Sequence, residues 1–186
     1  MSDYEIWEER YRIKGDKRKE PDAFLKDNWQ KLKFGRVLDV ACGCGRNACY
    51  LAHRGFEAVG VDRSPLAIGH AKKRAADEGI APQFYVVDLE KLHIPHAPYD
   101  SIVITRYLQR DLCPCLVKAL KPGGILLYET YTLDYLRYGE RTADYLLKPG
   151  ELKELFSELE ILHYEECDKP ETREYTARLL ARRPLA

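Results

Sequence analysis

The chain has 186 residues, of which 45% are hydrophobic, enough to bury one substantial core but too few for two ordinary domains and a linker. Thirty basic residues balance thirty acidic ones, so the chain lacks the overall positive charge that draws proteins onto nucleic acid. We therefore expect a single domain over residues 1–186 and no nucleic-acid partner.

The N-terminus carries no basic stretch followed by an apolar run, so neither a signal peptide nor a transit peptide is expected. No apolar run approaches the roughly 20 residues that span a bilayer, which favours a cytoplasmic protein with no membrane partner. The six cysteines, at positions 42, 44, 49, 113, 115 and 167, lack the spacing of a zinc site. We expect no bound metal and interpret these thiols as small apolar residues, with binding of a soft substrate as the alternative.

Apolar residues at helical spacing predict two helices before the main fold, at residues 4–11 and 22–32. The charged segment between them, residues 14–20, contains Gly15 and is typical of an exposed loop. Residues 1–34 are therefore expected to form a helical cap.

From residue 36, short Val- and Ile-rich runs alternate with helical stretches, the pattern of a parallel sheet built from strand-helix-strand units. Strands are predicted at residues 36–41, 57–62, 83–87, 100–105 and 124–131. Helices are predicted at residues 46–54, 65–78 and 111–120, the last stopped by Lys121-Pro122-Gly123-Gly124.

The alternation stops after Thr132. Residues 133–148 form an irregular, tyrosine-rich stretch, and a helix is predicted at 149–156. Two final runs, 159–166 and 175–182, flank a polar turn and predict an antiparallel hairpin.

A glycine turn follows the first predicted strand, in the sequence Asp39-Val-Ala41-Cys-Gly43-Cys-Gly45-Arg. Glycine allows a ligand close to the backbone, because no Cβ stands in the way and positive φ is accessible. The second strand ends in Asp62, nineteen residues beyond Gly43, a spacing that suits a carboxylate binding two ribose hydroxyls.

A third acid, Asp88, follows the third predicted strand and would lie on the same carboxyl edge of the sheet. Its carboxylate can accept a hydrogen bond from an adenine amino group, while the backbone N–H of Leu89 meets a ring nitrogen. Each acid alone is also explained as a cap of the following helix. Three at successive strand ends beside a glycine turn favour a nucleoside-binding edge.

These residues resemble the motifs of class I S-adenosylmethionine-dependent methyltransferases. The 39–45 stretch is similar to their first motif, Asp62 to their ribose-binding acid, Asp88 to their adenine-binding acid, and residues 120–124 to their Leu-Lys-Pro-Gly-Gly turn. The resemblance implies an α/β fold: a doubly wound, mostly parallel seven-stranded sheet with an antiparallel last strand and helices on both faces. It implies S-adenosylmethionine as cofactor and S-adenosylhomocysteine as product.

Three further features resemble the tellurite-resistance methyltransferases: the Trp7-Glu-x-Arg10-Tyr11 opening, Cys44-Gly-Arg-Asn47, and the Leu-Lys-Pro-Gly-Glu-Leu run at 147–152. Ala41 departs from the glycine that is commonest at its position, which can alter the approach of the methionine moiety. The resemblance implies the following cofactor-binding residues: Arg10, Tyr11, Asp39, Ala41, Gly43, Gly45, Asn47, Asp62, Arg63, Asp88, Leu89 and Thr105.

The acceptor is expected at the ends of the fourth and fifth strands, where Arg106, Tyr107, Tyr131 and Arg137 are candidate acceptor-side residues. Arginine there suits an anionic acceptor. Methyl transfer from a sulfonium mainly needs near-attack geometry and exclusion of water, and a base only where the acceptor is protonated. No base is assigned from the sequence, and the expected acceptor is a small molecule such as a soft anion or a thiol.

Two alternatives stay open at this point. Gly43-x-Gly45-x-x-Ala48 followed by Asp62 also fits the fingerprint of an NAD(P)-dependent oxidoreductase. A non-catalytic cofactor-binding partner protein is the other, with the tyrosine-rich stretch as an interface.

Overall fold

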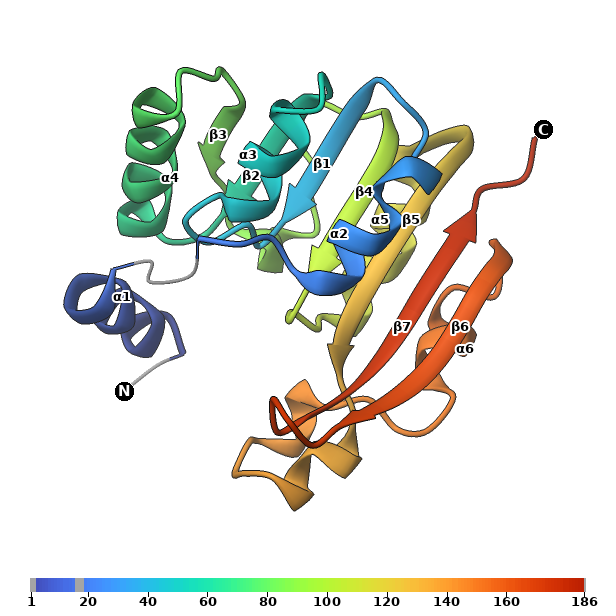
Figure 1. Cartoon of the computed structure of the whole chain (residues 1–186). Coiled ribbons are helices and arrows are strands. Elements are labelled where there is room, and N and C mark those ends of the chain that lie inside the picture. The colour runs from blue at the N-terminus through green and yellow to red at the C-terminus, as the bar shows by residue number, and fades with distance from the viewer. Residues whose placement is uncertain (1–2, 16–18, 186) are drawn as a thin grey trace.

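The structure is a computed structural model that describes residues 3–15 and 19–185. Positions 16–18 of the predicted charged loop lie outside the described residues. Seven strands form one sheet in the order β3-β2-β1-β4-β5-β7-β6 (Figure 1). The strands are β1 (Arg36–Val40), β2 (Glu57–Asp62), β3 (Gln83–Val86), β4 (Tyr99–Thr105), β5 (Leu120–Tyr131), β6 (Glu160–Lys169) and β7 (Glu174–Arg182).

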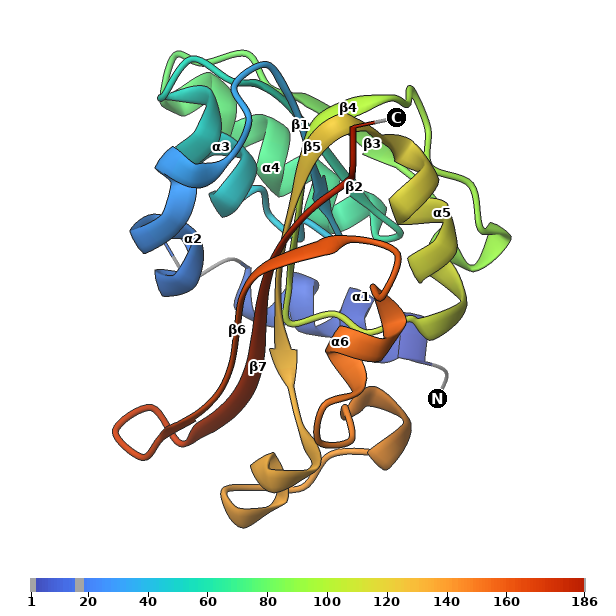
Figure 2. The same ribbon diagram turned by 90° about the vertical axis from the view of Figure 1, so that its right-hand side faces the viewer.

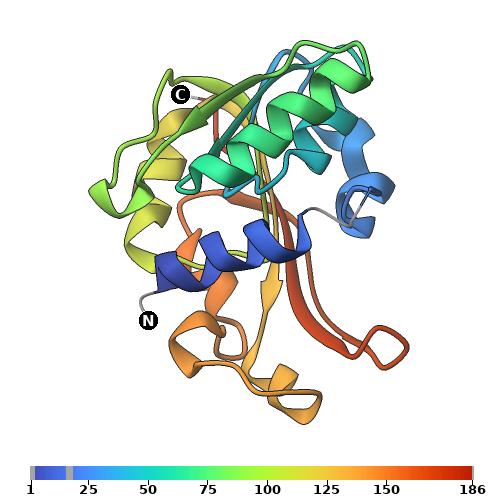
Figure 3. The same ribbon diagram turned by 90° about the vertical axis from the view of Figure 1, so that its left-hand side faces the viewer.

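Helices cover both faces of this sheet. They are α1 (Asp3–Lys14), α2 (Ala23–Asn28), α3 (Arg46–Ala52), α4 (Pro65–Asp77), α5 (Cys113–Ala119) and α6 (Glu151–Leu155). Figure 2 shows α2, α3 and α4 on one face and α5 and α6 on the other. Helix α1 runs beneath the carboxyl ends of the first strands and contacts α4 (Figure 3).

The central strands are buried on both faces, as their continuous apolar sequence requires. Alternate residues of β1 contribute to two hydrophobic cores, one on each face of the sheet. Val37 belongs to the core under α2, α3 and α4, whereas Leu38 and Val40 belong to the core under α5 and α6. The same alternation holds in β4, where Val103 faces one core and Ile102 the other. Burial from both sides fixes the register that brings the strand ends to one edge.

The predicted seven-stranded, doubly wound sheet is confirmed. Strands β1 to β5 are parallel, and β7 runs antiparallel to both β5 and β6. The predicted start of the fifth strand is wrong: β5 begins at Leu120, before the predicted glycine turn. The pairing of β4 with β5 shifts register between Tyr99 and Ser101. This irregularity accommodates the glycine turn inside β5.

The N-terminal and connecting helices also differ in length from the prediction. Helix α1 extends to Lys14, whereas α2 ends at Asn28 and continues as one 3-10 turn, Trp29–Lys31. Helix α5 likewise begins only at Cys113, after a 3-10 turn. No helix among residues 3–15 and 19–185 is long and apolar enough to span a bilayer.

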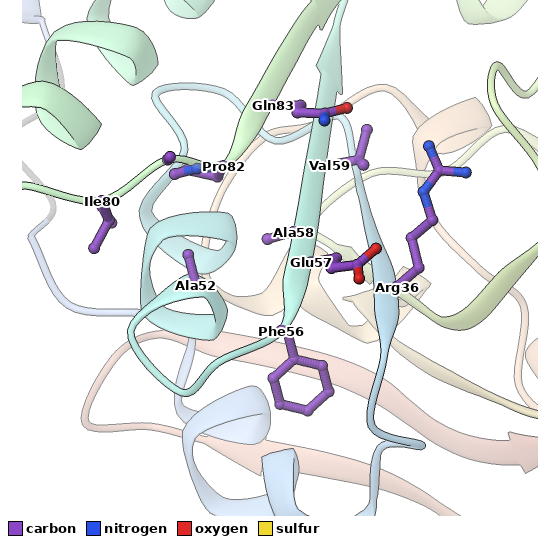
Figure 4. Close-up of a pocket in the computed structure, with 10 residues that line it drawn as sticks. Arg36, Ala52, Phe56, Glu57, Ala58, Val59, Ile80, Pro82 and Gln83 are labelled. Atoms are coloured by element: carbon purple, nitrogen blue, oxygen red, sulfur yellow. The ribbon is translucent and has the colours of Figure 1, made fainter.

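A cavity of about 330 Å³ lies at the amino-terminal edge of the sheet (Figure 4). Arg36, Glu57 and Gln83, the first residues of β1, β2 and β3, line it together with Phe56 and Pro82. Ligands of open α/β sheets bind at the opposite edge, outside the carboxyl ends of the strands. A second cavity opens at that carboxyl edge.

Candidate functional site

The glycine turn connects β1 to α3 in a series of left-handed residues. Gly43 has a φ of 54° and Gly45 a φ of 78°, values that glycine adopts without steric cost. Ala41 adopts a φ of 53° and carries a Cβ, so it is held in a conformation that disfavours alanine. The turn therefore has a backbone conformation at position 41 that favours glycine, although the residue there is alanine.

Asp62 ties the turn to the end of β2. The backbone N–H of Gly43 donates to Asp62 Oδ2 over 2.8 Å, and that of Ser64 donates to Oδ1 over 2.9 Å. Burial raises the pKa of Asp62, although these two hydrogen bonds oppose the shift. Each oxygen keeps a second lone pair, so the carboxylate can still accept from a ligand hydroxyl.

Helix α1 places two side chains over this turn. The hydroxyl oxygen of Tyr11 lies 3.0 Å from where a Cβ on Gly43 would stand. Glu8 lies near enough to Asp62 to raise its pKa, and its Oε1 atom is buried without a hydrogen-bond partner among the described residues. An unpaired buried acceptor beside Asp62 fits a ligand that brings hydroxyl donors, such as a ribose.

A cavity of about 220 Å³ opens beside the turn. Its lining combines the turn, α1 and the ends of β4 and β5: Trp7, Arg10, Tyr11, Gly15, Ala41, Cys42, Gly43, Cys44, Arg46, Asn47, Thr105, Arg106, Tyr131 and Arg141. Four of these residues are arginines and none is acidic. The cavity therefore favours anionic groups.

Asp22, just before α2, neutralises two of the four arginines. It is 3% exposed, pairs with Arg46, and accepts from Arg106 Nε over 2.9 Å. Burial raises the pKa of Asp22, but the two guanidinium groups outweigh that effect and hold the pKa below its usual 3.8. The buried side chain of Asn47 joins this cluster, donating to Asp22 Oδ2 over 3.2 Å and to Thr105 Oγ1 over 3.0 Å.

The other two arginines have no such neutralisation. Among the described residues, no carboxylate pairs with Arg10 or Arg141. Arg10 lies over the ring of Trp7 at 4.8 Å, and Arg141 lies over the ring of Tyr131 at 4.3 Å. Stacking on an aromatic ring fixes a guanidinium without cancelling its charge, so both remain able to bind an anion.

Asp39 supports the turn from below. It is 2% exposed and accepts from the backbone N–H of Ala48 over 3.1 Å, at the start of α3. Burial, with the nearby charge of Asp22, raises its pKa to about 8. Asp39 is therefore a buried structural acid of this site and does not line the cavity.

The predicted adenine-binding residues lie further along the same edge. Asp88 is exposed and accepts from the backbone N–H of Glu90 over 3.2 Å, so it caps the short turn that follows β3. Leu89 is 5% exposed, and Arg63 donates to Glu90 Oε1 over 2.9 Å. The second oxygen of Asp88 accepts no hydrogen bond from the described residues, which fits an additional ligand donor.

Of the four acceptor-side candidates, Arg106 and Tyr131 line the cavity. Tyr107 instead donates to Gln109 Oε1 over 2.5 Å and packs against the main core, and Arg137 pairs with Asp134 outside the cavity. Asp22, Glu8, Arg46 and Arg141 were missed. Glu8 and Asp22 come from the N-terminal segment and Arg141 from the irregular stretch, whose positions at the sheet edge no local pattern reveals. Arg46 instead begins α3, directly after the glycine turn.

Within the described residues, no group of three His, Cys, Asp or Glu side chains is arranged to hold a metal ion.

Part of the chain matches a known protein family. Residues 37–124 match the family described as a methyltransferase domain. An uncharacterized methyltransferase of Bacillus subtilis strain 168, YodH, is 32% identical over 100 residues, which cover 49% of this chain and 41% of YodH. Ribosomal protein L11 methyltransferase of Thermus thermophilus is 35% identical over 91 residues, covering 48% and 35% respectively. The chain thus spans less than half of either relative.

Solved structures share the fold over almost the whole chain. TehB from Haemophilus influenzae superposes with a TM-score of 0.76 at 22% identity, covering 95% of this chain and 67% of TehB. N-methyltransferase NodS from Bradyrhizobium japonicum in complex with S-adenosylhomocysteine gives a TM-score of 0.73 at 19% identity, covering 97% and 98%. At this identity the likeness establishes the fold.

Proposed function

We propose that this chain is a class I S-adenosylmethionine-dependent methyltransferase and that it transfers the methyl group of this cofactor to a small, negatively charged acceptor. A soft anion or a thiolate is the acceptor class that this proposal favours. The observation that carries it is the cavity beside the glycine turn, where Arg10 and Arg141 have no carboxylate partner among the described residues.

The residues at the turn fit the cofactor. Gly43 lines the cavity without a Cβ, Asp62 and the unpaired oxygen of Glu8 offer acceptors to the ribose hydroxyls, and Asp88 offers one to the adenine. We assign Arg10 to the carboxylate of the methionine moiety. The bound cofactor supplies a methyl group on a positively charged sulfur, which needs no further activation.

Arg141 is assigned to the acceptor. It is fixed over the rings of Tyr131 and Tyr135, at 4.3 Å and 5.6 Å, on the side of the cavity formed by the end of β5. Because catalysis of methyl transfer depends mainly on positioning, a fixed charge that orients a small anion contributes directly to the rate. Arg106 is held by Asp22 and Glu174, so it is less available to a ligand.

Calorimetric titration of the purified protein tests the cofactor part, after mass spectrometry for ligand already bound. Micromolar binding of S-adenosylhomocysteine without binding of NADH is expected. Binding of NADH alone would instead support an NAD(P)-dependent oxidoreductase. Incubation with S-adenosylmethionine and selenite, tellurite or small thiols then tests the acceptor part. Cofactor binding with no methylated product from any of them would favour a non-catalytic partner protein.

A further inference from the structure

The end of β5 and the start of β7 place a tyrosine and a carboxylate in contact at the wall of the cavity. Tyr131 is 6% exposed and lines the cavity, and its hydroxyl donates to Glu174 Oε1 over 3.2 Å. Arg106 Nη1 donates to the Tyr131 hydroxyl oxygen over 2.7 Å and to the same Glu174 oxygen over 2.6 Å. The hydroxyl is thus held with its proton directed at Glu174.

Glu174 connects this hydroxyl to the surface of the protein. It is the first residue of β7, beside the pairing of Tyr131 with Thr176 that joins β5 to β7. Its side chain is 15% exposed, and its second oxygen accepts from Thr172 Oγ1 over 3.3 Å. A proton that reaches this carboxylate therefore has a route to solvent.

We infer that Tyr131 and Glu174 form a proton relay that deprotonates the methyl acceptor as it is methylated. This inference rests on the proposed function, and it extends the acceptor class to thiols that arrive protonated. The arrangement satisfies the geometric requirement for general-base catalysis, because one group reaches the cavity and a second group stands within hydrogen-bond distance behind it. Glu174 acts through Tyr131 and is in this sense a positioning residue.

With a thiol as acceptor, an S–H bond and a methyl–sulfur bond break, and an S–CH₃ bond forms. The electron pair of the S–H bond forms the new S–CH₃ bond, and the pair of the broken methyl–sulfur bond stays on the sulfur of the departing S-adenosylhomocysteine. The thiol proton moves to Tyr131 Oη, and the proton of Tyr131 moves to Glu174. Glu174 later releases it to water.

The charges around the pair support this direction of transfer. Arg106 and Arg141 face Tyr131 and favour negative charge on its oxygen, whereas burial and Glu174 oppose it. Asp22 shares Arg106 and so limits its effect. Tyr131 therefore passes a proton on as it receives one, instead of standing ionised beside Glu174.

Two acceptor substrates distinguish a proton relay from a purely structural role of these residues. Both carry a carboxylate, but their thiols differ in ionisation. The thiol of 2-nitro-5-thiobenzoate is ionised at neutral pH, whereas that of 3-mercaptopropionate is mostly protonated. Tyr131→Phe and Glu174→Gln are expected to lower kcat about 100-fold with 3-mercaptopropionate at pH 7, and at most a few-fold with 2-nitro-5-thiobenzoate. The lost rate should return about tenfold per pH unit as the alkyl thiol ionises.

The chain offers a matched control. The hydroxyl of Tyr138 also donates to a carboxylate, that of Asp168, but away from the cavity. Tyr138→Phe and Asp168→Asn should leave both rates and both pH profiles as in the wild type. Equal losses with the two acceptors, or pH profiles unchanged in Glu174→Gln, would overturn the relay alone. Wild-type protein that binds S-adenosylhomocysteine but methylates neither thiol would overturn the proposed function, and the relay with it.

Discussion

The backbone N–H of Gly43 donates a 2.8 Å hydrogen bond to Asp62, so the turn after β1 is fixed by the acid that ends β2. The same carboxylate also accepts from Ser64, at the start of α4. Asp62 thus shapes the glycine turn, and we propose that it also offers acceptors to the ribose of the cofactor. These roles respond differently to substitution.

Replacing Asp62 by alanine removes both roles. We expect binding of S-adenosylhomocysteine to weaken by about 1–3 kcal/mol, since ribose hydroxyls and two backbone N–H groups lose their acceptor. Asp62→Asn keeps one side-chain oxygen and should lose less affinity. Calorimetry of both variants, with circular dichroism to confirm folding, makes the comparison. Unchanged affinity in folded Asp62→Ala would remove this residue from the site.

Gly45 and Gly150 have the same φ of 78° but different surroundings. Substituting each by alanine therefore distinguishes the cost of backbone strain from the cost of close packing. A Cβ on Gly45 would approach Phe84 Cζ to 2.7 Å and Ala71 Cβ to 2.9 Å, whereas a Cβ on Gly150 meets nothing within 4 Å. Gly150→Ala should cost about 1–2 kcal/mol of stability from the left-handed backbone alone. Gly45→Ala should cost about 1–3 kcal/mol more. Urea unfolding of the two variants measures this difference, and equal losses would contradict the close packing.

Asp39 makes stability depend on pH. Its pKa is about 8 in the folded protein and 3.8 in an unperturbed chain, so the folded state binds the extra proton between these values. Stability from this group is therefore highest below about pH 4 and falls as pH rises toward 8. Asp39→Asn removes the titration while keeping an oxygen for the Ala48 N–H. The wild type should therefore lose stability relative to the variant as pH rises. Between pH 5 and pH 8 the difference in unfolding free energy should shift by more than about 1 kcal/mol in favour of the variant. A constant difference would contradict the raised pKa.

Arg10 and Arg141 should separate cofactor from acceptor binding. Arg141→Gln is expected to raise KM for an anionic acceptor at least tenfold, about 1.4 kcal/mol, and to leave affinity for S-adenosylhomocysteine unchanged. Arg10→Gln should weaken S-adenosylhomocysteine binding instead, because we assign it to the methionine carboxylate. Steady-state kinetics and calorimetry on both variants provide the comparison. If Arg141→Gln weakened cofactor binding and Arg10→Gln raised KM for the acceptor, the two assignments would be exchanged.

Asp22 should be essential to the stability of the site. Asp22→Asn leaves Arg46 and Arg106 facing each other without a carboxylate, and breaking a buried ion pair typically costs about 3–5 kcal/mol. Thermal unfolding of the variant tests this loss. Lys73–Asp77, an exposed ion pair within α4, provides the control, since Asp77→Asn should cost less than about 1 kcal/mol. Comparable effects of the two substitutions would contradict a structural role for Asp22.

The apolar strand pattern is sufficient to predict the sheet from the sequence. Buried runs such as Val37–Val40 place apolar side chains on both faces of the sheet, and the glycine turn and the acids at the ends of β2 and β3 lie within a few residues of those runs. Their neighbourhood in space follows from the parallel arrangement alone. The motif residues around Gly43 were therefore within reach of sequence reasoning.

The rest of the site comes from segments without a repeating pattern. Asp22 is the first residue of the helix predicted at 22–32, yet its carboxylate lies between two arginines from α3 and the end of β4. Arg141 and Arg137 are four residues apart in the same irregular stretch, and only Arg141 lines the cavity. Which of two such arginines faces a ligand depends on tertiary packing, which composition and periodicity do not encode.

Transfer of an isotope-labelled methyl group tests the central claim most directly. Purified protein is incubated with methyl-labelled S-adenosylmethionine and 2-nitro-5-thiobenzoate, and the products are separated and identified by mass spectrometry. We expect the labelled S-methyl product together with an equal amount of S-adenosylhomocysteine, and a much lower yield from Arg141→Gln at the same acceptor concentration. Protein that binds S-adenosylhomocysteine yet transfers no label to this or any small anionic acceptor would contradict the account.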